Sequence, residues 1–130
     1  MREIKFRGKR FDNHEWVYGS LLVHPFGETD IIPFNTTKAH PVAEYTVGQF
    51  TGLKDFWGNE IYDGDILRLN AGDPVDMETV FIVDWNSDYG VWAVSINDHP
   101  IGNRPLGQWL REVKLAIVGN IYNALKQDKK

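Results

Sequence analysis

Apolar residues recur at every second position through most of this 130-residue sequence. The clearest case is VFIVDWNSDYGVWAVSI, residues 80–96, in which two β-branched and aromatic runs flank NSDYG. A period of two places alternate side chains on opposite faces of a β-strand, whereas a helix needs a period of 3.6. Asn, Asp and Gly tolerate the backbone angles of a tight reversal. The segment therefore predicts a β-hairpin, and we expect Phe81, Val83 and Trp85 to share one face.

The N-terminal region shows the same alternation. Apolar residues alternate with Lys and Arg from residue 4 onward, and a second apolar run at 16–23 follows the turn-like DNHE, which predicts a first hairpin. Residues 24–46 are rich in turn-forming residues and predict an irregular insertion, in which only Ile31 and Ile32 indicate a short strand.

Near the C-terminus, LGQWLREV at 106–113 is the only segment that favours a short helix, and KLAIVGNIY at 114–122 predicts a last strand before a polar tail. A chain of this length with 42% hydrophobic residues can bury one core. We therefore expect a single, mainly β domain over residues 1–130. It should be a small twisted sheet or half-open barrel with the irregular insertion and at most one or two short helices.

The segment TGLKDFWGNEIYDGDILRL, residues 51–69, combines apolar alternation with two turn signals. Gly58 follows FW and precedes Asn, a pattern typical of a reversal, and Gly64 stands where the apolar phase shifts. Glycine reaches backbone angles that are closed to other residues, so a bulge or sharp bend explains the shift. The carboxylates of Asp63 and Asp65 are then expected to accept backbone N–H bonds within the turn.

An alternative for the same stretch is a divalent-metal site formed by Glu60, Asp63 and Asp65, since hard cations prefer oxygen ligands. The sequence marks no further ligands, so we favour the structural turn and expect no metal. Phosphate-binding, dinucleotide-binding and hydrolase-elbow motifs are absent, and the chain has no cysteine. These absences favour a protein that is not an enzyme and needs no cofactor.

The four histidines, His14, His24, His40 and His99, lack the i, i+4 spacing of a helical metal site. We interpret each as a loop residue. His24 and His40 bracket the insertion, where either could meet Asp30 or Glu44, but the sequence does not show whether they do.

The net charge of −4 is unevenly distributed. Residues 1–10 carry +4 and residues 111–130 carry +3, so residues 11–110 carry −11. A duplex-binding face needs many cations directed at phosphates. The candidates are the N-terminal Lys5, Arg7, Lys9 and Arg10. We favour instead a solvated first strand whose charges protect a sheet edge.

Aromatic residues make up 13% of the chain and include five tryptophans. Such side chains suit the packing of β-strands, and they also form stacking platforms for single-stranded nucleic acid. We favour core packing, and we keep Trp57 and Tyr62 as candidate binding residues. The full set considered for a platform is Tyr18, Trp57, Tyr62, Tyr89 and Trp92.

A family resemblance is carried by MREIKFRGKRFDNHEWVYGSL at 1–21, VGQFTGLKDFWGNEIYDGDILRL at 47–69 and IVGNIY at 117–122. In order and spacing these segments resemble the YopX-like family of bacteriophage and prophage proteins. The resemblance implies a small, mainly β protein with a barrel of the Src-homology type, of phage origin and acting in the host cytoplasm. It implies no activity and supplies no catalytic residues, because the family's biochemical role is not established.

We therefore expect a non-enzymatic phage accessory protein that binds a macromolecule, and we favour a host or phage protein over nucleic acid. The absence of cysteines favours the bacterial cytoplasm, and no apolar run is long enough for a bilayer. No membrane partner is expected. Three alternatives stay open: a nucleic-acid-binding module, a structural homo-oligomer, and a small metal-dependent hydrolase.

Overall fold

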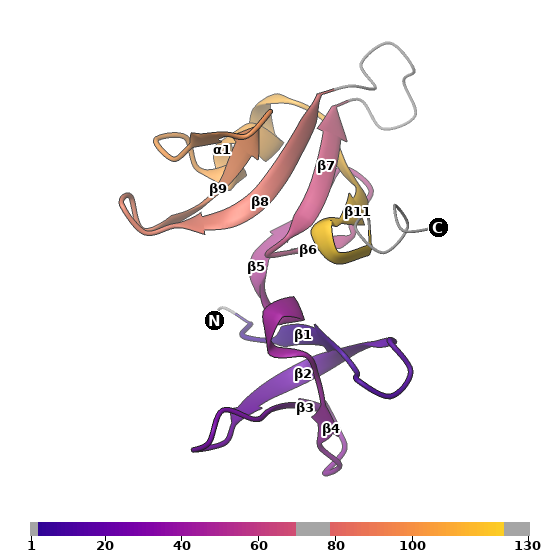
Figure 1. The fold of residues 1–130 in the computed structure, drawn as a ribbon. Coiled ribbons are helices and arrows are strands. Elements are labelled where there is room, and N and C mark those ends of the chain that lie inside the picture. Colours follow the sequence, from indigo (N-terminus) through magenta and orange to yellow (C-terminus); the bar gives the residue numbers. More distant parts are fainter. Residues whose placement is uncertain (1–2, 70–78, 124–130) are drawn as a thin grey trace. The chain divides into compact units, whose positions relative to one another are not determined.

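A computed structural model (Figure 1) describes residues 3–69 and 79–123 of the chain. The chain divides into two compact units, residues 1–52 and 53–130. Each unit has its own hydrophobic core, and each is described by itself. The mainly β prediction is confirmed, while the prediction of a single domain over 1–130 stays a prediction.

The first unit is an antiparallel sheet with the strand order β4-β3-β2-β1-β5. Register pairs such as Phe6↔Gly19 and Lys9↔Trp16 join β1 to β2, which confirms the predicted first hairpin. Strand β5 begins in this unit and ends in the second. The elements are β1 (Phe6–Lys9), β2 (Trp16–Val23), β3 (Thr29–Pro33), β4 (His40–Pro41), the 3₁₀ helix η1 (Glu44–Thr46) and β5 (Gly48–Lys54).

The core of the first unit is small. Val17, Ile31 and Val42 are buried together, and Phe6, Leu21 and Val47 pack against them. The short strand predicted at Ile31 and Ile32 is confirmed as β3, which pairs with β2 over five positions. The segment 24–46 also contains β4 and η1, and it supplies two of the three central core residues, Ile31 from β3 and Val42 from the stretch between β4 and η1.

The expectation of a solvated edge strand at the N-terminus is wrong. Strand β1 pairs with β2 on one side and with β5 on the other. Arg7 and Lys9 are only 5% and 9% exposed, and their cationic groups lie 4.7 and 5.6 Å from the centroid of the Trp16 ring. Long basic side chains can cover apolar surface with their stems and attract an aromatic face. Charge alone therefore did not reveal that these residues are packed.

The second unit contains a sheet with the order β10-β9-β8-β7-β11, also antiparallel in the register pairs β10–β9, β9–β8, β8–β7 and β7–β11. Neither sheet closes into a barrel within the described residues. The elements are β6 (Glu60–Tyr62), β7 (Asp65–Leu69), β8 (Val80–Asn86), β9 (Val91–Ile96), β10 (His99–Ile101), α1 (Leu106–Glu112) and β11 (Leu115–Asn120).

The hairpin predicted at 80–96 is confirmed as β8 and β9, and the helix predicted at 106–113 is confirmed as α1. The last predicted strand is β11, which ends at Asn120 because this side chain caps a helical turn. Its Oδ1 accepts the N–H groups of Tyr122 and Asn123 at 3.0 and 2.9 Å. The predicted polar tail after residue 123 lies outside the described residues.

Side chains from β6 to β9, α1 and β11 form the core of the second unit. Phe81 and Val83 are buried there, and Trp109 of α1 meets Phe81 edge-to-face at a centroid distance of 5.3 Å. Trp85 lies further along β8, is half exposed, and packs on its cross-strand partner Trp92. The buried members of the core are Ile61, Leu67, Phe81, Val83, Val94, Leu106 and Leu115.

Candidate functional site

Asp55 organises the turn that carries Gly58. Its Oδ1 accepts the backbone N–H groups of Trp57 and Asn59 at 2.9 and 2.8 Å, and its own N–H donates to the Asn59 carbonyl. Gly58 has φ +85°, in the left-handed region that favours glycine. The spacing of Asp and Gly therefore gives an Asx-type turn between β5 and β6.

The same Asp55 side chain holds the turn to β11. Its Oδ2 accepts the N–H of Ile117 at 2.9 Å, and the Phe56 N–H donates to the Leu115 carbonyl at 2.8 Å. Strand β11 is the end strand of its sheet, so these bonds cover part of an otherwise unpaired edge. Sequence reasoning found the turn at Gly58 but missed this role of Asp55, because a local sequence pattern does not indicate a hydrogen-bond partner 62 positions further along the chain.

The second turn contains Asp63, Gly64 and Asp65. Gly64 is buried with φ +90°, receives a hydrogen bond from Ile121 and donates one to Val83. The Oδ2 of Asp65 accepts the Tyr62 N–H at 2.7 Å within the turn, and Asp65 is buried. Asp63, which lies between Tyr62 and Gly64 in the chain, is partly buried.

The arrangement of these carboxylates bears on the metal-site alternative. Within residues 3–69 and 79–123, no group of three or more His, Asp or Glu side chains is placed to hold a metal ion. Glu60 lies in β6, and the Asp65 carboxylate serves the backbone of the turn. The described geometry therefore supports a structural role for this acidic stretch.

The four candidate phosphate-binding residues are all engaged with protein groups. Lys5 pairs with Glu3 at 3.3 Å and lies over the Phe50 ring, while Arg7 and Lys9 lie over Trp16. Arg10 makes two hydrogen bonds to the Asp12 carboxylate, at 3.0 and 2.6 Å. They do not form an open row of cations along β1.

The two candidate aromatic residues differ in exposure. Tyr62 is 3% exposed and belongs to the interior, as the core-packing interpretation predicted, but that interpretation is wrong for Tyr18, Trp57 and Tyr89, which are exposed. Trp57 is 63% exposed and rests edge-to-face against Phe56 at 4.9 Å. Tyr62 therefore offers no ring face to a base, and Trp57 remains available to a partner.

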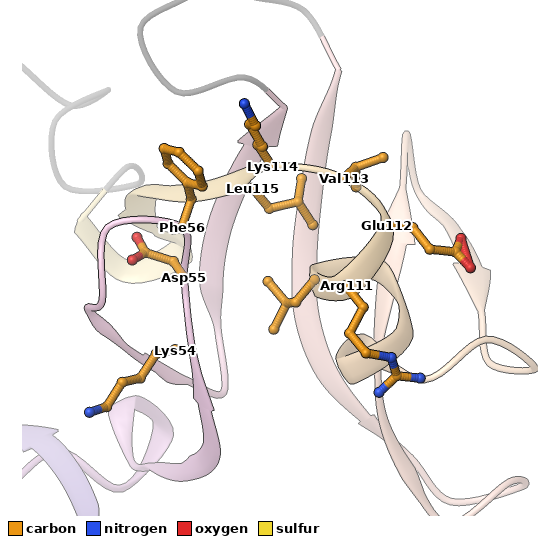
Figure 2. Close-up of a pocket in the computed structure, with 9 residues that line it drawn as sticks. Lys54, Asp55, Phe56, Arg111, Glu112, Val113, Lys114 and Leu115 are labelled. Carbon is orange, nitrogen blue, oxygen red and sulfur yellow. The ribbon is translucent and has the colours of Figure 1, made fainter.

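Figure 2 shows a hollow in the second unit, lined by residues 54–56 and 110–115. Its volume is about 220 Å³. The charged ends of Lys54, Arg111 and Lys114 point away from one another in this view. A catalytic or cofactor site needs polar groups that converge on one point. This hollow lacks that convergence, so we assign it no ligand.

A larger groove, of about 560 Å³, lies in the first unit. Val42, which is buried, contributes to its lining together with Thr29, while the exposed side chains of Phe11 and Phe26 project beside it. Phe11 follows β1, residues 26–28 belong to the β2–β3 loop, and the remaining lining residues come from the segment between the start of β3 and η1. The full lining is Phe11, Phe26, Gly27, Glu28, Thr29, Asp30, Pro41, Val42 and Glu44.

The tip of the β2–β3 hairpin is locally fixed. The His24 N–H donates to the Glu28 carbonyl at 2.8 Å, the Gly27 N–H donates to the His24 carbonyl at 3.0 Å, and Gly27 has φ +94°. This turn leaves Phe26 at the apex, 97% exposed. Across the same hairpin, His24 Nε2 lies 2.8 Å from Asp30 Oδ2. The sequence had left open whether His24 meets Asp30, and the structure brings them together.

Both units are thus built mainly of antiparallel strands, and the larger of the two hollows described above lies in the first unit. The chain is therefore a small protein built mainly of β-strands. Its sequence matches the family model described as YopX protein over residues 5–125, which is nearly the whole chain. The chain therefore belongs to the YopX family. No curated protein matches it. Within the described residues, no helix is long and apolar enough to cross a membrane.

Proposed function

We propose that this protein is a non-enzymatic accessory protein of a bacteriophage or prophage that acts in the host cytoplasm by binding another protein. The observation that carries the proposal is the groove of the first unit, with Phe26 almost fully exposed at its rim. The phage origin and the compartment rest on the resemblance of the three sequence segments to YopX-like proteins.

An aromatic side chain held in water by a fixed turn is a natural anchor for a partner. Burying one phenylalanine contributes about 1.5–3 kcal/mol relative to leaving it exposed. Interfaces concentrate their binding energy in a few aromatic anchors near the centre of the contact. Phe26 and Phe11 lie beside the same groove, so both could be covered by one partner.

A protein partner is favoured over nucleic acid because of the charges at the groove and at the N-terminal basic residues. The groove is lined by carboxylates, which repel phosphate, and the cations of residues 5–10 are engaged with Trp16, Phe50 or carboxylates. Nucleic-acid affinity depends mainly on free cations that neutralise phosphates.

The test compares three forms of the tagged full-length protein expressed in a bacterial host: wild type, the double variant Phe11→Ser/Phe26→Ser, and Phe34→Ser. Phe34 is an exposed phenylalanine of the same unit outside the groove, so it controls for the loss of an aromatic side chain. Bound proteins are identified by mass spectrometry and bound nucleic acid is quantified in the same eluates.

We expect a protein that wild type and Phe34→Ser retain and that the double variant loses. Nucleic acid retained equally by all three forms, with no protein dependent on Phe11 and Phe26, would contradict the proposal. Light scattering on the purified protein addresses self-association, since a dimer lost only in the double variant would make the partner a second copy of this chain.

A further inference from the structure

We infer that the groove of the first unit takes a basic segment of its partner, one that inserts a large apolar side chain between Lys or Arg residues. This inference rests on the proposed function and names the chemistry of the partner. It depends on the charges around the groove, on its apolar surface and on the form of the neighbouring sheet edge.

Every charged residue among those that line the groove is acidic: Glu28, Asp30 and Glu44. Within the described part of the chain, Glu28 and Glu44 form no ion pair, whereas Asp30 pairs with His24. Arg10, whose backbone bridges to Val42, directs its guanidinium to Asp12. The lining therefore carries uncompensated negative charge, which attracts a cationic partner and disfavours an acidic one.

The apolar part of the lining defines where a side chain of the partner would enter. Phe11, Phe26 and Pro41 line the groove together with the buried Val42. The groove volume falls within the range of about 300–1,000 Å³ typical of ligand sites. A large aliphatic or aromatic side chain would bury its own surface and that of the two phenylalanines together.

Strand addition is disfavoured as the mode of binding. Strand β4 ends the first-unit sheet, is only two residues long, and contains Pro41, which has no N–H to donate. Main-chain pairing along this edge could therefore supply few hydrogen bonds. Affinity must come from the inserted side chain and from the flanking charges.

The hairpin tip reduces the entropic cost of binding. The backbone hydrogen bonds that close the turn at His24, Gly27 and Glu28 fix the main chain that carries Phe26 before a partner arrives. A pre-organised anchor loses less conformational freedom on binding. The carboxylate of Glu28 lies in the same turn, so the anchor and one charge are presented together.

The test is a selection from a library of random peptides on the immobilised full-length protein, followed by fluorescence anisotropy with the enriched peptides. Four forms are compared: wild type, Phe11→Ser/Phe26→Ser, Glu28→Gln/Glu44→Gln, and the control Glu15→Gln, which removes an exposed carboxylate of the same unit outside the groove. Circular dichroism verifies that each variant is folded before binding is compared.

We expect wild type and Glu15→Gln to enrich peptides in which Lys or Arg flanks a large apolar residue. Glu28→Gln/Glu44→Gln should weaken their binding about tenfold. It should also reduce the difference in affinity between ~50 and ~200 mM salt, because screening acts on exposed charges. The double phenylalanine variant should lose the enriched peptides.

Four results would overturn the inference. Enriched peptides that are neutral or acidic, or that bind Glu28→Gln/Glu44→Gln as tightly as wild type, refute the basic partner. If those peptides still require Phe11 and Phe26, the proposed function stands. Peptides that ignore all groove variants, or no enrichment at all, count against the groove as a protein-binding surface and thus against both proposals.

Discussion

The carboxylate of Asp55 lies 2.9 Å from the backbone nitrogen of Ile117, a residue 62 positions further along the chain. The other oxygen of the same carboxylate accepts two N–H groups of its own turn. One buried side chain therefore closes the β5–β6 turn and fixes it on the edge of the second-unit sheet. A carboxylate that accepts several backbone N–H bonds is a strong acceptor, and its removal leaves those donors unsatisfied.

The first prediction concerns this carboxylate. Asp55→Ala should lower the free energy of unfolding by about 2–4 kcal/mol, because three backbone N–H groups lose their acceptor. Urea titration monitored by tryptophan fluorescence measures the change. Asp88→Ala removes an exposed carboxylate in the β8–β9 turn and should change the stability by less than about 0.5 kcal/mol. Equal effects of the two substitutions would contradict the role assigned to Asp55.

The second prediction concerns Gly64. Gly64→Ala should destabilise by about 1–2 kcal/mol, because a side chain resists the positive φ. Its Cβ would also lie 3.3 Å from the Tyr122 ring. Gly119 is the matched control, since a Cβ there meets nothing within 4 Å and its φ is not in the left-handed region. Thermal unfolding of both variants measures the loss of stability. If Gly64→Ala is as stable as Gly119→Ala, the positive φ at position 64 does not require glycine.

Local signals in the sequence were sufficient for much of the fold. The hairpin at 80–96 and the helix at 106–113 follow from period and turn residues that lie within a few positions of each other. Gly64 was found because it interrupts an alternation, which is also a local signal. These features depend on backbone preferences that neighbouring residues determine.

The sequence was insufficient where a side chain depends on a partner from another strand. Arg7 and Lys9 were expected to be solvated, yet they lie on Trp16, which the sheet register brings beside them. The groove escaped prediction for the same reason, since its lining comes from several separate loops and strands. Aromatic residues at 11 and 26 carried no local signal that distinguishes an anchor from a core side chain.

The third prediction concerns pH. Asp84, on β8, is exposed to solvent on one side, and the partial desolvation of its carboxyl group by neighbouring atoms raises its pKa above the usual 3.8. The folded protein therefore binds this proton more tightly than the unfolded chain does. The resulting stabilisation is complete below the ordinary pKa and is lost as the pH rises through the folded-state value.

Asp84→Asn should remove that part of the pH dependence. Between pH ~3 and ~6, the wild-type melting temperature minus that of Asp84→Asn should fall as the pH rises. Differential scanning calorimetry across this range measures both proteins, with Asp88→Asn as the control for a carboxylate in the turn of the same hairpin. A difference that stays constant or increases with pH would show that partial desolvation does not disfavour the charged form of Asp84.

The last prediction concerns the basic residues of the first strand. Random duplex and single-stranded DNA should bind more weakly than about micromolar even at ~50 mM salt, where counterion release most favours binding. The reason is structural, since Lys5 and Arg10 pair with Glu3 and Asp12, and the cations of Arg7 and Lys9 lie over Trp16. Fluorescence anisotropy with labelled oligonucleotides at ~50 and ~200 mM salt measures the affinity.

The packing of Arg7 on Trp16 can be tested separately, by thermal unfolding. Arg7→Ala should lower the melting temperature, because it removes a nearly buried side chain from the Trp16 ring, whereas Lys38→Ala removes an exposed cation of the same unit and should not. Micromolar or tighter DNA binding that is lost at ~200 mM salt and in Lys5→Ala/Arg10→Ala, but is kept in Lys38→Ala, would establish a phosphate-contacting strand. That result would replace the protein-binding proposal with a nucleic-acid module, because the affinity would then depend on the cations that flank β1 and not on the phenylalanines of the groove.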